Sequence, residues 1–232
     1  AIIAIILSSS FGLYTWMNNP ESQMVAVTVR AGSKAEMALP DGTFVHLNAA
    51  TNLEYDVNNS KQRLVKLSGE AFFDVAKNPD CPFKVIINDL QIEVVGTSFN
   101  VKTYKKDIVE TSLLSGRIRI SGGSLPHEYT LSPGQKATYS AMDRTLRISK
   151  ADAHVEAGWR DNYLIFESTP LIDVIAQIER WYGVEIRLHH KQIAQDLLSG
   201  SFRNESIQNV IRSLSIQYGF KYEIHKDIIT IY

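Results

Sequence analysis

The C-terminal part of the sequence repeats itself with a period of 36 residues. Seven positions carry the same kind of residue in both copies, and the two members of every pair are 36 residues apart. They are Phe166, Leu171, Val174, Ile175, Ile178, Tyr182 and Gly183 in the first copy, and Phe202, Ile207, Val210, Ile211, Leu214, Tyr218 and Gly219 in the second. The middle positions are spaced i, i+3, i+4 and i+7, which places them on one apolar face of a helix. Each copy therefore predicts a strand, a helix and a second strand.

The repeat predicts a small α+β domain over residues 162–232 in the order βαβ, βαβ, β. Pro170 suits the first turn of the first helix, and Asn204 is positioned to cap the second. Gly183 and Gly219 stand where a left-handed residue ends a helix. We interpret the aromatic and aliphatic residues of the repeat as core, and we expect no ligand site among them.

A second, all-β domain is predicted over residues 27–150. Turn-forming residues such as Pro40-Asp41-Gly42 and Pro133-Gly134 recur about every ten residues, and short runs such as Phe44 to Leu47 lie between them. This spacing predicts either a β-sandwich or a short β-solenoid. The fold class is thus mainly β plus α+β.

Three strands are predicted in the middle of the β domain, at Ala71 to Val75, Phe83 to Ile87 and Gln91 to Val95. A meander is their simplest arrangement. Glu70 and Asp74 fall in the first of these runs, and we interpret both as solvent-facing or turn-capping carboxylates rather than catalytic groups.

Residues 1–17 carry no charge and include Tyr14 and Trp16, residue types that lie at membrane interfaces, so they predict a transmembrane helix. A span needs about 20 apolar residues, and we therefore expect it to begin upstream of Ala1. Residues 18–26 form a linker. No basic residue precedes Arg30, which places the rest of the chain on the non-cytoplasmic side. A secretory signal peptide is the alternative, although no basic segment precedes its apolar part.

Residues 151–161 are more polar than their surroundings, and we interpret them as a linker whose Trp159 docks onto one neighbouring domain. His154 has no second His or Cys at ligand spacing, so no metal site is predicted.

Composition argues against several other classes of function. Lys and Arg number 24 against 25 Asp and Glu, without a basic cluster, which disfavours nucleic-acid binding. The single cysteine, Cys81, has no basic neighbour in sequence and is interpreted as an inert thiol. Neither a Gly-x-Ser-x-Gly nor an HExxH motif is present. We therefore expect no enzyme activity, no cofactor and no small-molecule substrate.

Five ordered motifs in the β domain resemble those of FecR-like proteins, the membrane-anchored anti-sigma factors and sigma regulators of Gram-negative bacteria. They are LPDGTxVxLNA (39–49), GEAFFDVAK (69–77), PFxV (82–85), VGTSFNV (95–101) and LSPGQ (131–135). The duplicated βαβ domain resembles the secretin and TonB short N-terminal domain, whose two helices lie between two small sheets. Such a domain closes many FecR-like proteins of the Bacteroidetes.

The resemblance implies a single-pass inner-membrane protein with the residues after about 18 in the periplasm. Its implied partners are the signalling domain of a TonB-dependent outer-membrane transporter and, through a cytoplasmic segment outside this sequence, an extracytoplasmic-function sigma factor. The alternative is a membrane-anchored glycan-binding or adhesion module, with Trp159, Trp181 and Tyr163 as sugar platforms. The two tryptophans, however, fall in the predicted linker and on a predicted helix rather than side by side on a sheet.

The final strand, Ile228 to Tyr232, is expected to lie at a sheet edge because no residue follows it here. An edge strand can pair with a strand of the transporter, a mode of recognition called β-augmentation. The residues predicted to contact the partner are Tyr222, Ile224, Ile229, Thr230 and Tyr232.

Overall fold

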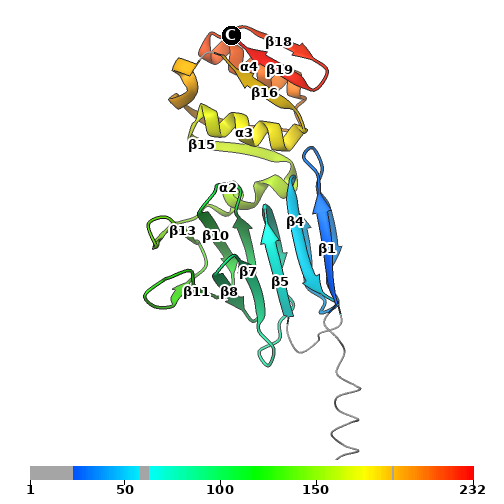
Figure 1. Cartoon of the computed structure of the whole chain (residues 1–232), viewed down its shortest axis with the longest axis vertical. Coiled ribbons are helices and arrows are strands. Elements are labelled where there is room, and N and C mark those ends of the chain that lie inside the picture. The colour runs from blue at the N-terminus through cyan, green and yellow to red at the C-terminus, as the bar shows by residue number, and fades with distance from the viewer. Residues whose placement is uncertain (1–22, 58–62, 190) are drawn as a thin grey trace, which may run out of the picture.

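The computed structural model describes residues 23–57, 63–189 and 191–232 and consists of two folded parts (Figure 1). Each part has a hydrophobic core of its own. The N-terminal part is all β and the C-terminal part is α+β, which confirms the predicted fold class. Among the described residues, no helix has the length and apolar content needed to cross a bilayer. The transmembrane helix predicted at residues 1–17 lies outside them.

The N-terminal part is a sandwich of two seven-stranded sheets, and so it corresponds to the first of the two predicted alternatives. The first sheet has the order β1 (Met24–Val29), β4 (Thr51–Asp56), β5 (Arg63–Ser68), β7 (Phe83–Ile87), β8 (Leu90–Val94), β11 (Ile118–Gly122) and β12 (Tyr129–Leu131). The second has the order β14 (Thr145–Lys150), β13 (Gln135–Ser140), β10 (Ile108–Ser115), β9 (Ser98–Lys102), β6 (Glu70–Asp74), β3 (Phe44–Leu47) and β2 (Ala35–Ala38).

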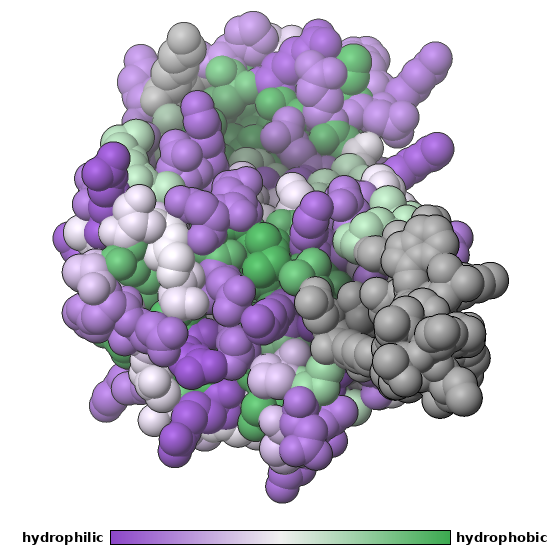
Figure 2. Space-filling view, turned by 60° about the horizontal axis from the view of Figure 1, so that its bottom comes forward, coloured by the Kyte–Doolittle hydropathy of each residue, from purple (hydrophilic) through white to green (hydrophobic). Residues whose placement is uncertain are grey.

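The inner faces of the two sheets meet in an aromatic contact. Phe73 of β6 stacks on Phe99 of β9 with ring centroids 5.2 Å apart, and it lies 5.8 Å from Phe83 of β7 in the opposite sheet. All three side chains are at most 1% exposed. The face of the molecule seen in Figure 2 is mainly hydrophilic, with hydrophobic side chains in limited areas. Alternation along the strands therefore sorts apolar side chains inward, as expected for a sandwich.

The predicted meander is wrong. β6 pairs with β3 and β9 in the second sheet, whereas β7 and β8 form a hairpin in the first. The chain crosses between the sheets at β6, which lets β5 and β7 pair in parallel. Strand propensity locates the runs but does not determine which sheet each run joins.

Arg63 holds the segment that returns from β6 to β7. Its guanidinium donates hydrogen bonds to the carbonyls of Ala76 and Cys81 at 2.6 Å and of Asn78 at 3.2 Å, and it pairs with Asp41 at 3.2 Å. Arg63 is 7% exposed, so its burial is compensated by acceptors on nearly every side.

The predicted linker at 151–161 is helical. It forms α2 (Ala153–Ala157) and the 3₁₀ helix η1 (Gly158–Asp161), and Asp152 caps α2 by accepting from the backbone N–H of His154. The short helices place Trp159 in a small buried cluster with Phe72 of β6 and Ala157.

The C-terminal part contains the predicted duplicated unit. Its elements are β15 (Tyr163–Pro170), α3 (Leu171–Tyr182), β16 (Glu185–Leu188), η2 (Lys191–Gln195), β17 (Leu197–Arg203), α4 (Ile207–Tyr218), β18 (Tyr222–His225) and β19 (Ile228–Ile231). β15 and β17 form one sheet, and β16, β19 and β18 form the other in that order. Both sheets and both helices contribute buried residues to a single core.

The predicted helix faces are confirmed. Val174, Ile175 and Ile178 of α3 are buried, as are the corresponding residues of α4. Gly183 and Gly219 end the helices with φ of +69° and +73°. Two details at the starts of the helices differ from the prediction. The α4 cap is Ser206, which accepts from the N–H of Asn209, rather than Asn204, and Pro170 precedes α3 as its N-cap.

Replacing Ile178 or Leu214 with Asp should unfold the C-terminal part, because each side chain is at most 1% exposed. A buried, unpaired charge costs several kcal/mol. Ile216→Asp is the matched control, since Ile216 lies on α4 but is 75% exposed. Thermal unfolding followed by circular dichroism measures the effect. Wild-type melting of either core variant would show that the two helix faces are assigned wrongly.

Candidate functional site

The strand predicted to bind a partner is not at an edge. β19 pairs in parallel with β16 on one side and antiparallel with β18 on the other, so it is the central strand of its sheet. The prediction that Ile228–Tyr232 forms an edge is therefore wrong. The last strand of a chain need not be the last strand of a sheet, and here the first βαβ unit supplies β16 as a parallel neighbour.

The five residues predicted to contact the partner are divided between core and surface. Ile229 is 1% exposed and belongs to the core. Thr230 lies on the central strand with neighbours on both sides. Tyr232 is 51% exposed, just beyond the end of β19. Tyr222 and Ile224 lie on β18, which pairs with no strand except β19 in the described part of the chain.

The backbone of β18 has a free side. The N–H of Tyr232 donates to the carbonyl of Lys221 at 2.9 Å, which makes these two residues a hydrogen-bonded pair. Hydrogen-bonded and non-hydrogen-bonded pairs alternate in an antiparallel ladder, so Glu223 also bonds to β19. The N–H and C=O groups of Tyr222 and Ile224 consequently point away from β19. These two residues are the ones that can receive an added strand.

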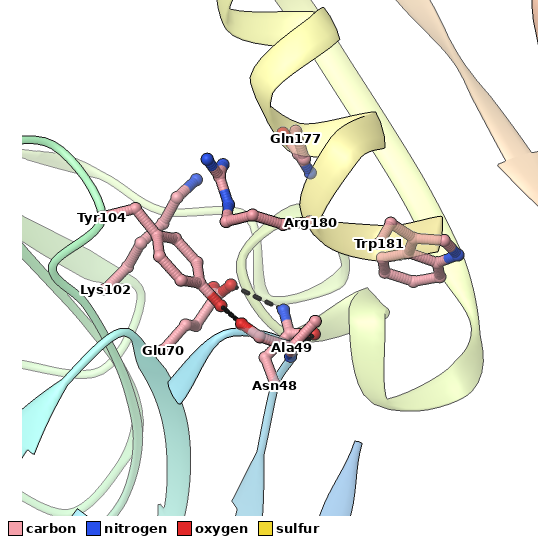
Figure 3. A pocket seen from close by; sticks show the side chains of 8 residues that line it. All are labelled: Asn48, Ala49, Glu70, Lys102, Tyr104, Gln177, Arg180 and Trp181. Carbon is pink, nitrogen blue, oxygen red and sulfur yellow. Dashed lines mark hydrogen bonds between the residues drawn. The ribbon is translucent and has the colours of Figure 1, made fainter. Parts of the chain in front are cut away.

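A second candidate site lies where the two folded parts touch. We call it the interdomain junction, and it consists of Gly32, Lys34, Glu70, Tyr104, Trp159 and Arg180. Figure 3 shows part of it, with Arg180 on α3 facing Tyr104 and Glu70 of the sandwich. None of these residues was predicted to form a contact between the two parts, apart from the docking of Trp159 on one neighbour.

Gly32 forms the closest backbone contact of the junction. It lies in the turn between β1 and β2, and its N–H donates to the carbonyl of Arg180 at 2.8 Å. Its φ is +78°, and an added Cβ would lie 3.1 Å from the carbonyl oxygen of Tyr182 and 3.3 Å from Cα of Gly183. Both the conformation and the space therefore require glycine.

Glu70 is buried at the junction, so the interpretation of this residue as solvent-facing is wrong. It is 7% exposed, and its two carboxylate oxygens accept from the side-chain amides of Asn48 at 2.7 Å and Asn100 at 2.9 Å. Asn100 in turn accepts from the indole N–H of Trp159 at 3.2 Å. A single polar network thus connects the sandwich to η1. Asp74, by contrast, is exposed and accepts from Ser98 Oγ, as expected.

Lys34 contacts both folded parts. Its ammonium donates to the carbonyl of Trp159 at 2.6 Å and to Asn162 Oδ1 at 3.0 Å, and it lies 3.7 Å from the ring centroid of Trp181. Burial lowers the pKa of Lys34 to about 8, although the negative charge of Glu70 acts in the opposite direction. The contact with the Trp181 ring is a cation–π interaction.

Arg180 and Tyr104 form a second cation–π contact across the junction. The guanidinium carbon lies 4.2 Å from the centroid of the Tyr104 ring. The Tyr104 hydroxyl donates to the carbonyl of Ala49. Burial, followed by the charge of Glu70, raises the pKa of Tyr104 above its usual range, so the hydroxyl remains a donor.

A cleft of about 630 Å³ opens beside the junction. Two ion pairs cross it: Lys105 Nζ lies 2.7 Å from Asp173 Oδ2, and Lys136 Nζ lies 2.9 Å from Glu156 Oε1. No group of three His, Cys, Asp or Glu side chains in the described residues is arranged to hold a metal ion. Paired charges thus form part of the lining of the cleft.

The aromatic residues considered as sugar platforms do not form one. Trp159 is 6% exposed, and Lys34 covers the ring of Trp181. Arg203 lies 4.7 Å from the ring centroid of Tyr163. These rings pack within the protein, which removes the observation that favoured a glycan-binding module.

Comparisons with known proteins agree with this architecture. The family described as FecR protein matches residues 25–119, and the family described as FecR, C-terminal, matches residues 163–231. Two crystal structures, each of a candidate anti-sigma factor from Parabacteroides distasonis ATCC 8503, are 30% identical to the chain and cover 90% of it. The match includes 98% of one structure with a TM-score of 0.80 and 99% of the other with a TM-score of 0.81. No curated protein matches the chain.

Replacing Gly32 with Ala should weaken the docking of the two parts. The left-handed φ alone costs roughly 1 kcal/mol, and overlap with the backbone of α3 adds about 1–3 kcal/mol. Gly134→Ala is a matched control, because Gly134 has the same φ of +78° but no atom within 4 Å of an added Cβ. Hydrogen exchange at the C-terminal end of α3 should accelerate only in Gly32→Ala. Equal exchange in both variants would mean that the turn contributes nothing to docking.

Proposed function

The chain belongs to the FecR family of anti-sigma factors, and from this we propose that its two folded parts receive a signal from a TonB-dependent outer-membrane transporter and relay it to an extracytoplasmic-function sigma factor. The family is regulatory and not enzymatic, so the chain is a sigma regulator. The transporter and the class of sigma factor are the proposed part.

The proposed location is the inner membrane, with a single span and the residues after about 18 in the periplasm. The uncharged apolar segment 1–17 and the lack of a basic residue before Arg30 support this orientation. In this arrangement the sandwich follows directly after the membrane segment, and the C-terminal part lies farther along the chain.

The observation that carries the proposal is the direct contact between the turn that follows β1 and α3 of the C-terminal part. β1 runs along the sandwich to the end that meets α3 (Figure 1), and the turn after it bonds to α3 through Gly32. A displacement of α3 by a bound transporter would therefore act on the strand nearest to the proposed membrane span.

The free side of β18 is the proposed contact with the transporter. Tyr222 and Ile224 present backbone donors and acceptors there, and an added strand would extend the sheet to four strands. This proposal replaces the contact expected at β19.

Replacing Ile224 with Pro should weaken binding of the transporter's signalling domain at least tenfold, because it removes an outward-facing N–H. Ile224→Ala is the control, since it removes the same side chain but keeps the donor. Titration of the signalling domain against residues 23–232, with circular dichroism to verify folding, measures both. Equal affinities for the two folded variants would place the contact on another surface.

Co-purification of the full-length protein with its sigma factor from membranes tests the other half of the relay.

A further inference from the structure

Two cations from different folded parts point into one pocket at the interdomain junction. Lys102 lies at the end of β9 and Arg180 in the last turn of α3, and both line the same pocket with Glu70, Tyr104 and Gln177. Figure 3 shows that the ammonium of Lys102 and the guanidinium of Arg180 extend into the same open space. We call these two residues the cation pair. Like charges repel, so an anion between them would be favourable.

The guanidinium of Arg180 has unused hydrogen-bonding capacity. Within the described residues the guanidinium forms no hydrogen bond and no ion pair. Its interaction with the face of the Tyr104 ring is a cation–π contact. Its burial lowers the pKa of Arg180 below the usual value, with nearby negative charges only partly opposing the effect. No side-chain nitrogen of the described residues is both fully buried and unpartnered, so the unpartnered donors of Arg180 are accessible to solvent.

Three of the carboxylates around the cation pair already have partners. Glu70 accepts two amide hydrogen bonds, and Asp173 pairs with Lys105 at 2.7 Å. Glu110 forms ion pairs with Lys136 at 3.0 Å and with Lys102 at 3.9 Å, the second of which is too long for a hydrogen bond. Their charges offset part of the positive potential without supplying an acceptor to Arg180. The acceptor must therefore come from water or from a ligand.

The adjoining cleft has the size and lining of a ligand site. Its volume of about 630 Å³ falls in the range of roughly 300–1,000 Å³ typical of small-molecule pockets. Its lining carries five carboxylates and four cations, Lys102 and Arg180 among them, together with apolar side chains such as Ile108, Val155 and Ile165. A ligand with one anionic group and an apolar body would match both the cation pair and this apolar lining.

We propose that the cation pair binds the carboxylate of a small organic acid whose apolar body lies in the cleft. The planar guanidinium presents paired N–H groups that match the two oxygens of a carboxylate, and the ammonium of Lys102 adds a third donor. Because Lys102 belongs to the sandwich and Arg180 to the C-terminal part, the bound acid connects the two. Its binding therefore stabilises their docked arrangement.

The test uses the full chain with two probes, benzoate and inorganic phosphate, at a constant ionic strength set with sodium chloride. We expect benzoate to bind saturably in isothermal titration calorimetry and more tightly than phosphate, which has no apolar body. Arg180→Gln should raise the dissociation constant for benzoate about 10- to 100-fold, since hydrogen bonds to a charged group are lost. Lys102→Gln should raise it by a smaller factor. Added benzoate should slow hydrogen exchange both near Lys102 and near Arg180.

The control is Arg212→Gln, which removes an exposed arginine from α4 and should leave binding unchanged. Arg180→Lys keeps the positive charge but loses the paired N–H groups of the guanidinium, so it should bind benzoate with intermediate affinity. If the Arg180 variants do not fold, the dissociation constant of Lys102→Gln tests the proposal instead. The proposal is overturned if benzoate does not saturate or if phosphate binds as tightly. An unchanged dissociation constant in a folded variant of the cation pair would overturn it as well.

Discussion

The buried carboxylate of Glu70 fixes the geometry on which the contact between the two folded parts depends. Removing a carboxylate from water costs several kcal/mol unless hydrogen bonds replace its hydration. Here the amides of Asn48 and Asn100 occupy the two oxygens, and the hydroxyl of Thr51 accepts from the backbone N–H of Glu70. The carboxylate therefore holds the end of β3, the start of β6 and the middle of β9 in one arrangement. Only with Asn100 held in this way is its carbonyl directed at the indole of Trp159.

Trp159 transmits that arrangement to the C-terminal part. Its ring packs against Phe72, and its backbone carbonyl accepts from Lys34. Lys34 in turn covers Trp181 on α3, so the position of α3 follows from contacts that begin at a carboxylate in the sandwich. The helical form of residues 151–161 matters for the same reason. In this helical form the indole of Trp159 reaches Asn100 and its backbone carbonyl reaches Lys34, both of which belong to the N-terminal part.

The parts of the fold that sequence predicts are those determined by neighbours along the chain. The faces of α3 and α4 follow from 3.6-residue periodicity, and Gly183 and Gly219 are recognisable as helix ends because only local conformation is involved. Strand pairing depends on residues far apart in sequence, which is why the sequence predicts one meander for β6 and β7 and an edge position for β19. Glu70 was missed for a related reason. Its partners Asn48 and Asn100 are 22 and 30 residues away, and a carboxylate in a β-rich run has no local sign of burial.

The interdomain junction and the two cores differ in the kind of interaction that holds them together, and this difference suits a relay. The cores consist of fully buried aliphatic and aromatic side chains, each worth about 1.5–3 kcal/mol on burial. The contacts that join the two parts include hydrogen bonds, ion pairs and cation–π interactions, such as Lys105 with Asp173 and Arg180 with Tyr104, and these charged contacts are each worth about 0–2 kcal/mol. A partner or an anion that alters a few of them can change the docking of the two parts while both cores stay folded. Because β1 meets α3 at this junction through Gly32, such a change would reach the first strand of the sandwich without crossing its core.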